Sequence, residues 1–123
     1  MLPFRGRVGF VTGGGTGIGR ACAQRLVDGG ARVMVCGRRE EVLEQAVREL
    51  GDGAAWVRAD VTDDTAVEAA VAATVDRFGR LDYAVNSAGR GPIVTDLNAT
   101  TADVRQTIDT NLTAALVLTR LVV

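Results

Sequence analysis

The sequence contains neither lysine nor histidine, so arginine provides every basic side chain. Without lysine, the chain cannot form a Walker-type phosphate loop, which requires Gly-Lys-Ser/Thr at the start of its helix. The 14 arginines are matched by 15 acidic residues, and the formal net charge is -1. Because no strong field of one sign results, we expect neither nucleic acid nor an anionic membrane as a partner.

Cysteine is also scarce, and long apolar runs are absent. The two cysteines, Cys22 and Cys36, lack C-x-x-C spacing and are too few for a disulfide scaffold, so we expect both in the core. No apolar run approaches the length of a membrane span, and residues 1–5 lack a signal-peptide core. These 123 residues are therefore predicted to form one globular, cytoplasmic domain.

Glycine, by contrast, is concentrated at residues 12–19, which read Thr-Gly-Gly-Gly-Thr-Gly-Ile-Gly. An apolar run precedes this stretch and a helical pattern follows it, which predicts a strand, a tight turn and a helix. Glycine permits positive φ in such a turn and lets the backbone approach a pyrophosphate closely, while the new helix directs unpaired N–H groups toward it. The predicted dinucleotide-binding residues of this turn are Thr12, Gly13, Gly15, Thr16, Gly17, Ile18 and Gly19.

The rest of the chain alternates apolar runs with helical patterns, which predicts a doubly wound α/β fold with a parallel sheet. Strands are expected over residues 8–12, 31–36, 54–59 and 81–85. Helices are expected from Gly17 to Gly29, over 40–50, after an N-cap at Asp63, and from about Thr101, with a capping box at Thr100 and Asp103. Helical spacing places these side chains on apolar faces: Ile18, Cys22, Leu26, Leu43, Leu50, Val67, Val71, Val75, Phe78, Val104 and Ile108.

The spacing T-G-x-x-x-G-x-G at residues 12–19 resembles the nucleotide-binding turn of the short-chain dehydrogenase/reductase family. A literal G-x-G-x-x-G does not fit, because Gly13 and Gly15 would require glycine at Ile18. The resemblance covers the whole chain and implies a Rossmann-type doubly wound parallel sheet that is incomplete. Residues 1–123 would be its N-terminal portion, with four strands and flanking helices, and the C-terminal catalytic portion would be absent.

Arg38 and Arg39 follow the second predicted strand, where dehydrogenases that prefer NAD usually carry Asp or Glu. A carboxylate there repels a 2′-phosphate, whereas a guanidinium pairs with it through forked, charge-assisted hydrogen bonds. We therefore predict NADP (NADPH) as the cofactor, with Arg38 as the main contact and Arg39 as a secondary one. The alternative is that the run from Arg38 to Glu41 is simply a solvated helix start.

Three further positions take their roles from the resemblance. Asp60 and Val61, after the third strand, are implied to contact the adenine, although Asp60 would alternatively cap the turn before the next helix. Asn111 matches the family's helix asparagine, which kinks its helix and holds a water in the proton relay. Asparagine is unfavourable in mid-helix, but a solvent-facing side chain would give the same pattern.

The run Asn-Ser-Ala-Gly at residues 86–89 resembles the N-N-A-G motif of the same family. Asn86 is expected to tie neighbouring strands together through backbone bonds. The small residues Ala88 and Gly89 are expected to let the chain pass close to the ribose and nicotinamide. The alternative is an ordinary turn at the end of a strand.

The activity that the resemblance implies is hydride transfer between NADP(H) and a carbonyl or alcohol substrate. In the family it depends on a Tyr, a Lys four residues later and an upstream Ser. Here the sole tyrosine, Tyr83, falls in the fourth strand and the sole serine, Ser87, in the cofactor turn. We expect these residues alone to be inactive, because losing a general acid costs ~10²–10⁴-fold in rate. Residues 90–97 are the only candidates for a substrate-pocket wall, and a homo-oligomer is expected at full length.

Two other functions stay open at this stage. A non-catalytic NADP-binding module would use the same turn, but it would leave the fourth strand as a sheet edge and the last helical turn uncapped. A nucleotide-dependent methyltransferase of similar architecture would need an acidic residue after the second strand to hold the ribose. The sequence Cys36-Gly37-Arg38 argues against that function.

Overall fold

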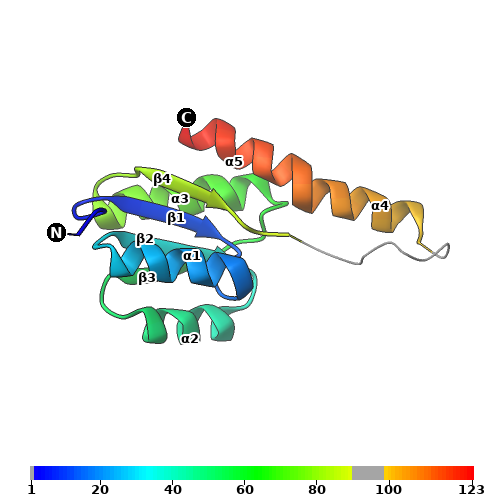
Figure 1. Ribbon diagram of the computed structural model, residues 1–123. Coiled ribbons are helices and arrows are strands. Elements are labelled where there is room, and N and C mark those ends of the chain that lie inside the picture. Colours follow the sequence, from blue (N-terminus) through cyan, green and yellow to red (C-terminus); the bar gives the residue numbers. More distant parts are fainter. Residues whose placement is uncertain (1, 90–98) are drawn as a thin grey trace.

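The computed structural model describes residues 2–89 and 99–123 and shows one sheet covered by helices (Figure 1). The four strands of the sheet are parallel and lie in the order β3-β2-β1-β4. Their bounds are β1 (Val8–Thr12), β2 (Arg32–Gly37), β3 (Ala54–Arg58) and β4 (Tyr83–Asn86). The helical segments are α1 (Gly17–Asp28), α2 (Glu40–Leu50), α3 (Asp64–Phe78), α4 (Thr101–Ile108), the π-helical η1 (Asp109–Thr113) and α5 (Ala114–Val122). The doubly wound parallel sheet is confirmed.

The two central strands, β1 and β2, are buried on both faces, which explains why they are nearly continuously apolar. Val11, Val33 and Val35 pack with α1 and α2 on one face. Phe10 and Met34 point to the opposite face, where they pack with α3 and α5. Because successive side chains of a strand alternate between faces, a strand covered on both sides must be apolar at nearly every position. The pattern read as a buried parallel strand is therefore confirmed.

The polar residues predicted to cap helices do so in the structure. Asp63 accepts a hydrogen bond from the Ala66 N–H (3.1 Å) and caps α3. Thr100 and Asp103 form the reciprocal capping box of α4. These local contacts satisfy N–H groups that have no partner inside the helix.

Four apolar side chains expected on buried faces are exposed instead, and Ile18, at 80%, is the most exposed of them. Val75 is 42% exposed, because α3 buries the stripe Val67, Ala70 and Thr74. At 3.6 residues per turn, Val75 lies about 80° around the helix from Val67, whereas Thr74 lies about 20° from it. Val104 and Ile108 are 45% and 48% exposed, since α4 projects past the sheet rather than across it (Figure 1).

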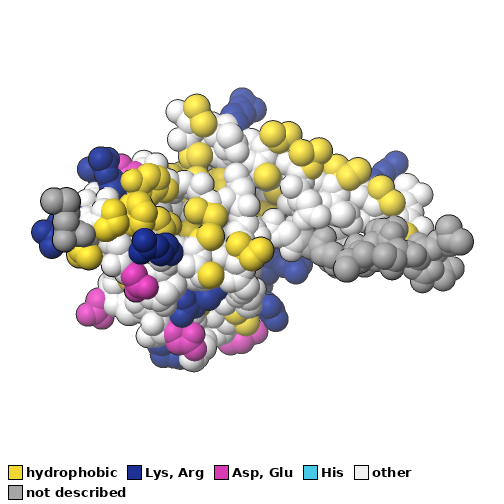
Figure 2. All heavy atoms as spheres, in the orientation of Figure 1, with side chains coloured by type: hydrophobic (Ala, Val, Ile, Leu, Met, Phe, Trp, Pro, Cys, Tyr) yellow, Lys and Arg dark blue, Asp and Glu magenta, His cyan; other side chains and the backbone are white. Residues whose placement is uncertain are grey.

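The exposed apolar residues of α4 continue along η1 and α5. Leu112 and Leu116 are 56% and 62% exposed. Figure 2 shows the resulting row of hydrophobic side chains along the upper edge of the molecule, over these helices. In the described ranges, no helix combines the length and the apolar character needed to cross a bilayer.

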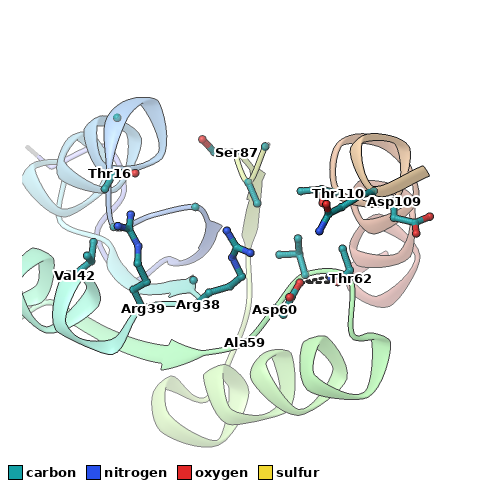
Figure 3. A pocket seen from close by; sticks show the side chains of 18 of the residues that line it. Thr16, Arg38, Arg39, Val42, Ala59, Asp60, Thr62, Ser87, Asp109 and Thr110 are labelled. Carbon is teal, nitrogen blue, oxygen red and sulfur yellow. Dashed lines mark hydrogen bonds between the residues drawn. The ribbon is translucent and has the colours of Figure 1, made fainter. Parts of the chain in front are cut away.

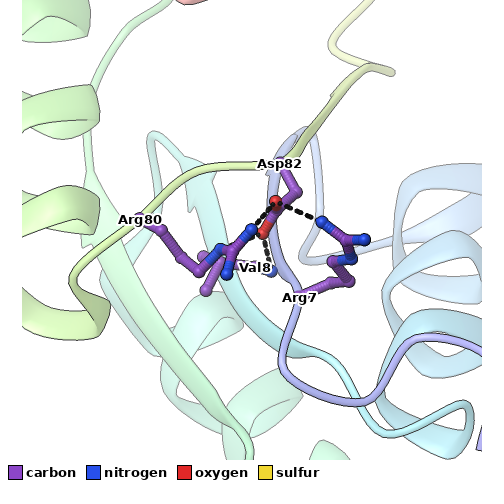
Figure 4. A network of polar contacts seen from close by, with 4 residues as sticks. All are labelled: Arg7, Val8, Arg80 and Asp82. Carbon is purple, nitrogen blue, oxygen red and sulfur yellow. Dashed lines mark hydrogen bonds and ion pairs between the residues drawn. The ribbon is translucent and has the colours of Figure 1, made fainter.

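A polar network around Asp82 joins the beginnings of β1 and β4 (Figure 4). The carboxylate accepts hydrogen bonds from Arg80 (2.7 and 2.9 Å), the Val8 N–H (2.9 Å) and Arg7 (3.2 Å). These donors, Arg80 first, lower the pKa of Asp82 from 3.8 to about 2. Strand pairing of β4 begins at Tyr83, two residues later than predicted, and the Asp82 N–H just before it donates to the Val8 carbonyl at 2.9 Å.

The Asp82→Asn variant is expected to be less stable than the wild type at neutral pH but not at pH 2. A lowered pKa means that folding favours the ionised carboxylate, so its stabilisation is complete above pH 3.8 and is lost as the pH falls to about 2. Urea unfolding of both proteins from pH 7 down to pH 2 measures the difference. Asp76→Asn, on the exposed side of α3, controls for loss of one charge. A difference that stays constant across this range would contradict the role of Asp82.

Candidate cofactor-binding site

A cavity of ≈ 1050 Å³ opens beside the carboxyl ends of the strands (Figure 3). It lies where the chain leaves β1 in the middle of the order β3-β2-β1-β4, the switch point at which open parallel sheets bind ligands. Its size suits a small molecule or cofactor, whose sites span ~300–1,000 Å³. The wall combines the glycine turn, the β2–α2 turn, the β3–α3 turn, the segment after β4, and residues of α4 and η1.

The glycine turn is tightly packed, and backbone atoms exclude a side chain at Gly13 and at Gly19. Gly13 has φ +62°, and a Cβ there would lie 2.9 Å from the backbone nitrogen of Ala88. A Cβ on Gly19 would collide with the carbonyl oxygen of Gly13. The turn therefore folds back on the start of its own helix and against the segment after β4. This cradle fits the close backbone approach that a pyrophosphate requires.

The N-terminus of α1 faces the cavity. Gly17 has φ +54°, and a Cβ there would meet nothing within 4 Å among the described residues. The Thr16 side chain forms no capping hydrogen bond within the described ranges, and the first turn of α1 carries no acidic residue. Ile18 is 80% exposed at the cavity wall, away from the partly buried Cys22 and Leu26. The unpaired N–H groups and the helix dipole thus favour an anion here.

Thr12, at the end of β1, is hydrogen-bonded to the segment that follows β4. Its side chain is buried, and its hydroxyl accepts hydrogen bonds from the Ser87 and Ala88 N–H groups, both at 3.1 Å. It also donates to the Val85 carbonyl at 3.4 Å. Ala88 and Gly89 are thereby held in the cavity wall.

The backbone of Asn86 pairs with Thr12 of β1 in the parallel register, whereas its side chain is directed to α5. Its amide donates to the Thr119 hydroxyl (3.3 Å) and to the Ala115 carbonyl (3.5 Å), so it joins β4 to α5. The reason is that β4 is the edge of the described sheet, with β1 on one side and α5 packed against it. The Thr12 hydroxyl adds a side-chain link from β1 to the segment after β4. Neither Thr12 nor Asn86 lines the large cavity.

Arg38 and Arg39 extend from the β2–α2 turn into the cavity wall (Figure 3). Both side chains are exposed, and neither has an ion-pair partner among the described residues. Arg39 stands at the N-cap of α2, whose first turn holds Glu40 and Glu41. The end of β2 therefore presents two guanidinium groups to a ligand and no carboxylate.

Asp60 and Val61 line the cavity beyond these arginines. One carboxylate oxygen of Asp60 accepts hydrogen bonds from the Thr62 N–H (2.9 Å) and hydroxyl (2.7 Å). Asp60 thus holds the turn before α3, as the capping alternative predicts, while remaining at the cavity. Val61 is buried beside it and supplies an apolar surface.

Asn111 lies in the middle of η1, where a π-helical turn interrupts the helix formed by α4 and α5. Such single turns recur at functional sites. The Asn111 side-chain oxygen would lie 3.3 Å from a Cβ on Gly89, so the two residues are neighbours. Asn111 does not line the cavity, and its part in a proton relay stays a prediction.

Tyr83 and the two cysteines lie away from the cavity. Tyr83 packs edge-to-face on Phe4 at 5.9 Å between ring centroids, at the opposite end of β4. Cys36 is fully buried as predicted, and burial raises the pKa of its thiol to about 12. Cys22 is only partly buried. In the described residues, no three potential metal ligands come together.

One wall of the cavity was not predicted from the sequence. Figure 3 shows Asp109 and Thr110 opposite Arg38, and the wall continues along α4 through Arg105 and Gln106. A helix pattern indicates an apolar face but not which polar residues will meet a turn distant in sequence. The predicted substrate wall at residues 90–97 lies outside the described residues.

A parallel α/β sheet with a glycine turn, an open helix N-terminus and a cavity at the switch point defines a dinucleotide-binding protein. The family profile described as short chain dehydrogenase matches residues 7–123. The chain belongs to this short-chain dehydrogenase family, an oxidoreductase family that uses nicotinamide cofactors.

Relatives and solved structures agree with this assignment. L-fucose dehydrogenase of Oryctolagus cuniculus is 41% identical over 122 residues, covering 96% of this chain and 42% of the relative. The 3-hydroxyacyl-CoA dehydrogenase type-2 of Drosophila melanogaster is 42% identical over 91 residues, covering 74% of this chain and 36% of the relative. A short-chain dehydrogenase/reductase structure from Brucella melitensis, 30% identical, superposes with a TM-score of 0.93 over 98% of this chain and 52% of that one. The chain thus spans about half or less of these proteins.

Proposed function

We propose that this chain binds NADP(H) as the N-terminal portion of an oxidoreductase that transfers hydride between NADP(H) and a carbonyl or alcohol substrate. The observation that carries the proposal is the pair Arg38 and Arg39 at the cavity wall, without ion-pair partners in the described ranges. A 2′-phosphate is the part of the cofactor that would satisfy these guanidinium groups through charge-assisted hydrogen bonds.

Each part of the cavity suits one part of the cofactor. The N–H groups around Gly17 would hold the pyrophosphate, and Asp60 with Val61 would border the adenine. The segment of Ala88 and Gly89, held by the Thr12 hydroxyl, would leave room for the ribose and nicotinamide. When bound, the nicotinamide supplies or accepts the hydride.

The chain by itself is proposed to be inactive or nearly so. It has no lysine, and Tyr83 lies too far from the cavity to donate a proton to a substrate there. The relatives, an L-fucose dehydrogenase and a 3-hydroxyacyl-CoA dehydrogenase, support a carbonyl or alcohol substrate but do not identify a particular one. Asn111 is proposed to serve the proton relay of the full-length protein. A cytoplasmic homo-oligomer is the proposed state of that protein.

Calorimetric titration of the 123-residue chain tests cofactor binding directly. We expect NADPH to bind about tenfold to hundredfold more tightly than NADH, because one or two charge-assisted hydrogen bonds to the 2′-phosphate distinguish them. S-adenosylmethionine serves as the negative control. Equal affinity for the two nicotinamide cofactors would contradict the NADP assignment, and binding of S-adenosylmethionine alone would restore the methyltransferase alternative.

The second candidate is a non-catalytic NADP-binding module, and cofactor titration does not separate it from the first. The coding DNA past codon 123 does. An in-frame continuation with a Ser and then a Tyr-x-x-x-Lys on a helix would support the reductase. A stop codon directly after Val123 would support the module.

A further inference from the structure

Arg58, the last residue of β3, makes a contact beside the cofactor site that no cofactor motif includes. Its Nε donates a hydrogen bond to the carbonyl oxygen of Arg38 at 3.1 Å. The parallel register places Arg58 opposite Gly37, directly beside the turn that carries the two cavity arginines. Arg58 itself is exposed and does not line the cavity.

The three carbonyl groups that lead from β2 into α2 each have a donor. The Gly37 carbonyl accepts from the Ala59 N–H (2.8 Å), and the Arg39 carbonyl accepts from the Leu43 N–H (3.1 Å). Both donors belong to the backbone and would be present with almost any sequence. Only the central carbonyl, that of Arg38, depends on a particular side chain, the guanidinium of Arg58.

That central peptide group decides where the cavity arginines point. Its carbonyl belongs to Arg38 and its N–H to Arg39, so its orientation sets the backbone angles on both sides. Arg38 is exposed, and without a donor its carbonyl would turn toward water. Binding a ligand orders the long arginine side chains, which costs conformational entropy. A fixed backbone reduces this cost, because the side chains sample fewer orientations before binding.

We propose that Arg58 is a positioning residue that sets the NADPH preference by holding the turn of Arg38 and Arg39 in its binding orientation. This inference rests on the proposed NADP(H) function. Arg58 acts through the Arg38 carbonyl and does not touch the cofactor. Its effect is therefore confined to the 2′-phosphate, the group that distinguishes NADPH from NADH.

Two substitutions separate this role from a simple effect of charge. In Arg58→Gln, the side-chain amide nitrogen stands at the same place along the chain as the arginine Nε, so a donor is kept while the charge is lost. Arg58→Met has a similar length and no donor. We expect Arg58→Met to weaken NADPH binding roughly threefold to tenfold, the range of one hydrogen bond, and Arg58→Gln to keep most of the wild-type affinity. NADH affinity should stay the same in both variants.

Calorimetric titration with NADPH and NADH measures these affinities, and circular dichroism with thermal unfolding checks the fold. Arg25→Met, at the exposed end of α1, controls for loss of a surface arginine. Equal losses of NADPH affinity in Arg58→Gln and Arg58→Met would show that Arg58 acts through its charge and not by positioning the turn. An unchanged NADPH affinity in Arg58→Met would show that Arg58 has no role in binding. If the wild-type chain binds neither cofactor, the proposed function itself fails and this inference fails with it.

The double variant Arg38→Ala/Arg58→Met gives an independent check. If Arg58 acts through the turn, its substitution should add less than about twofold once the main phosphate contact is gone. A full additional loss would mean that Arg58 reaches the phosphate directly, which would overturn the positioning role.

Discussion

Replacing Arg38 with aspartate is expected to lower NADPH affinity at least about tenfold and to reverse the preference toward NADH. The substitution removes a charge-assisted donor and places a carboxylate where a 2′-phosphate would lie. In NADH the same carboxylate meets a ribose hydroxyl, which can donate a hydrogen bond to it. The two effects act in opposite directions, so the ratio of the two dissociation constants is the most sensitive measurement.

Two matched variants show whether the effect of Arg38→Asp is local. Arg39→Asp, in the same turn, should reduce NADPH affinity by a smaller factor, since Arg39 is the secondary contact. Arg32→Asp lies at the opposite end of β2 and is exposed, so it changes the net charge equally without facing the cavity. If the ratio of NADPH to NADH affinity is unchanged in Arg38→Asp, Arg38 does not contact the 2′-phosphate. The alternative, that the arginines only form the solvated start of a helix, would then hold.

Gly19→Ala is expected to weaken the binding of both cofactors more than about tenfold and to destabilise the fold by ~1–3 kcal/mol. The new methyl group would press on the Gly13 carbonyl, which is backbone and cannot move without opening the turn. Within α1, the same substitution would ordinarily stabilise a helix by ~1 kcal/mol. A fall in the unfolding free energy would therefore report the collision and not helix propensity.

The control for Gly19→Ala is the same substitution at Gly53. A Cβ there would meet the Ala31 carbonyl oxygen at 3.4 Å, an ordinary contact, and Gly53 does not line the cofactor cavity. Titration with NADPH and NADH, together with urea unfolding, compares the two variants. If Gly19→Ala bound both cofactors like the wild type, the tight closure of the turn would not be needed for binding.

Local features of this chain were predictable because their causes are short-range. The glycine turn, the Asp63 N-cap and the capping box of Thr100 and Asp103 each depend on residues within a few positions of one another. The buried strands were predictable for a similar reason, since an apolar run must be covered on both faces wherever the helices lie.

The failures concern partners distant in sequence. Helical spacing identified Val104 and Ile108 as an apolar face but could not show that α4 extends past the sheet. Nothing near Asn86 in the sequence indicated that α5 supplies its side-chain partners, 29 and 33 residues away. The Thr12 hydroxyl reaches N–H groups 75 and 76 residues later, a contact that exists only because β4 pairs with β1.

The cofactor site shows the same division. By itself, the sequence determined the glycine turn and the basic end of β2, because backbone conformation and side-chain charge are properties of single residues. Tertiary structure decided that Arg58 holds the Arg38 carbonyl and that Arg105 and Asp109 close the opposite wall. The physical reason is that strand order and helix placement bring distant residues together, and they are fixed by burial of the whole sheet.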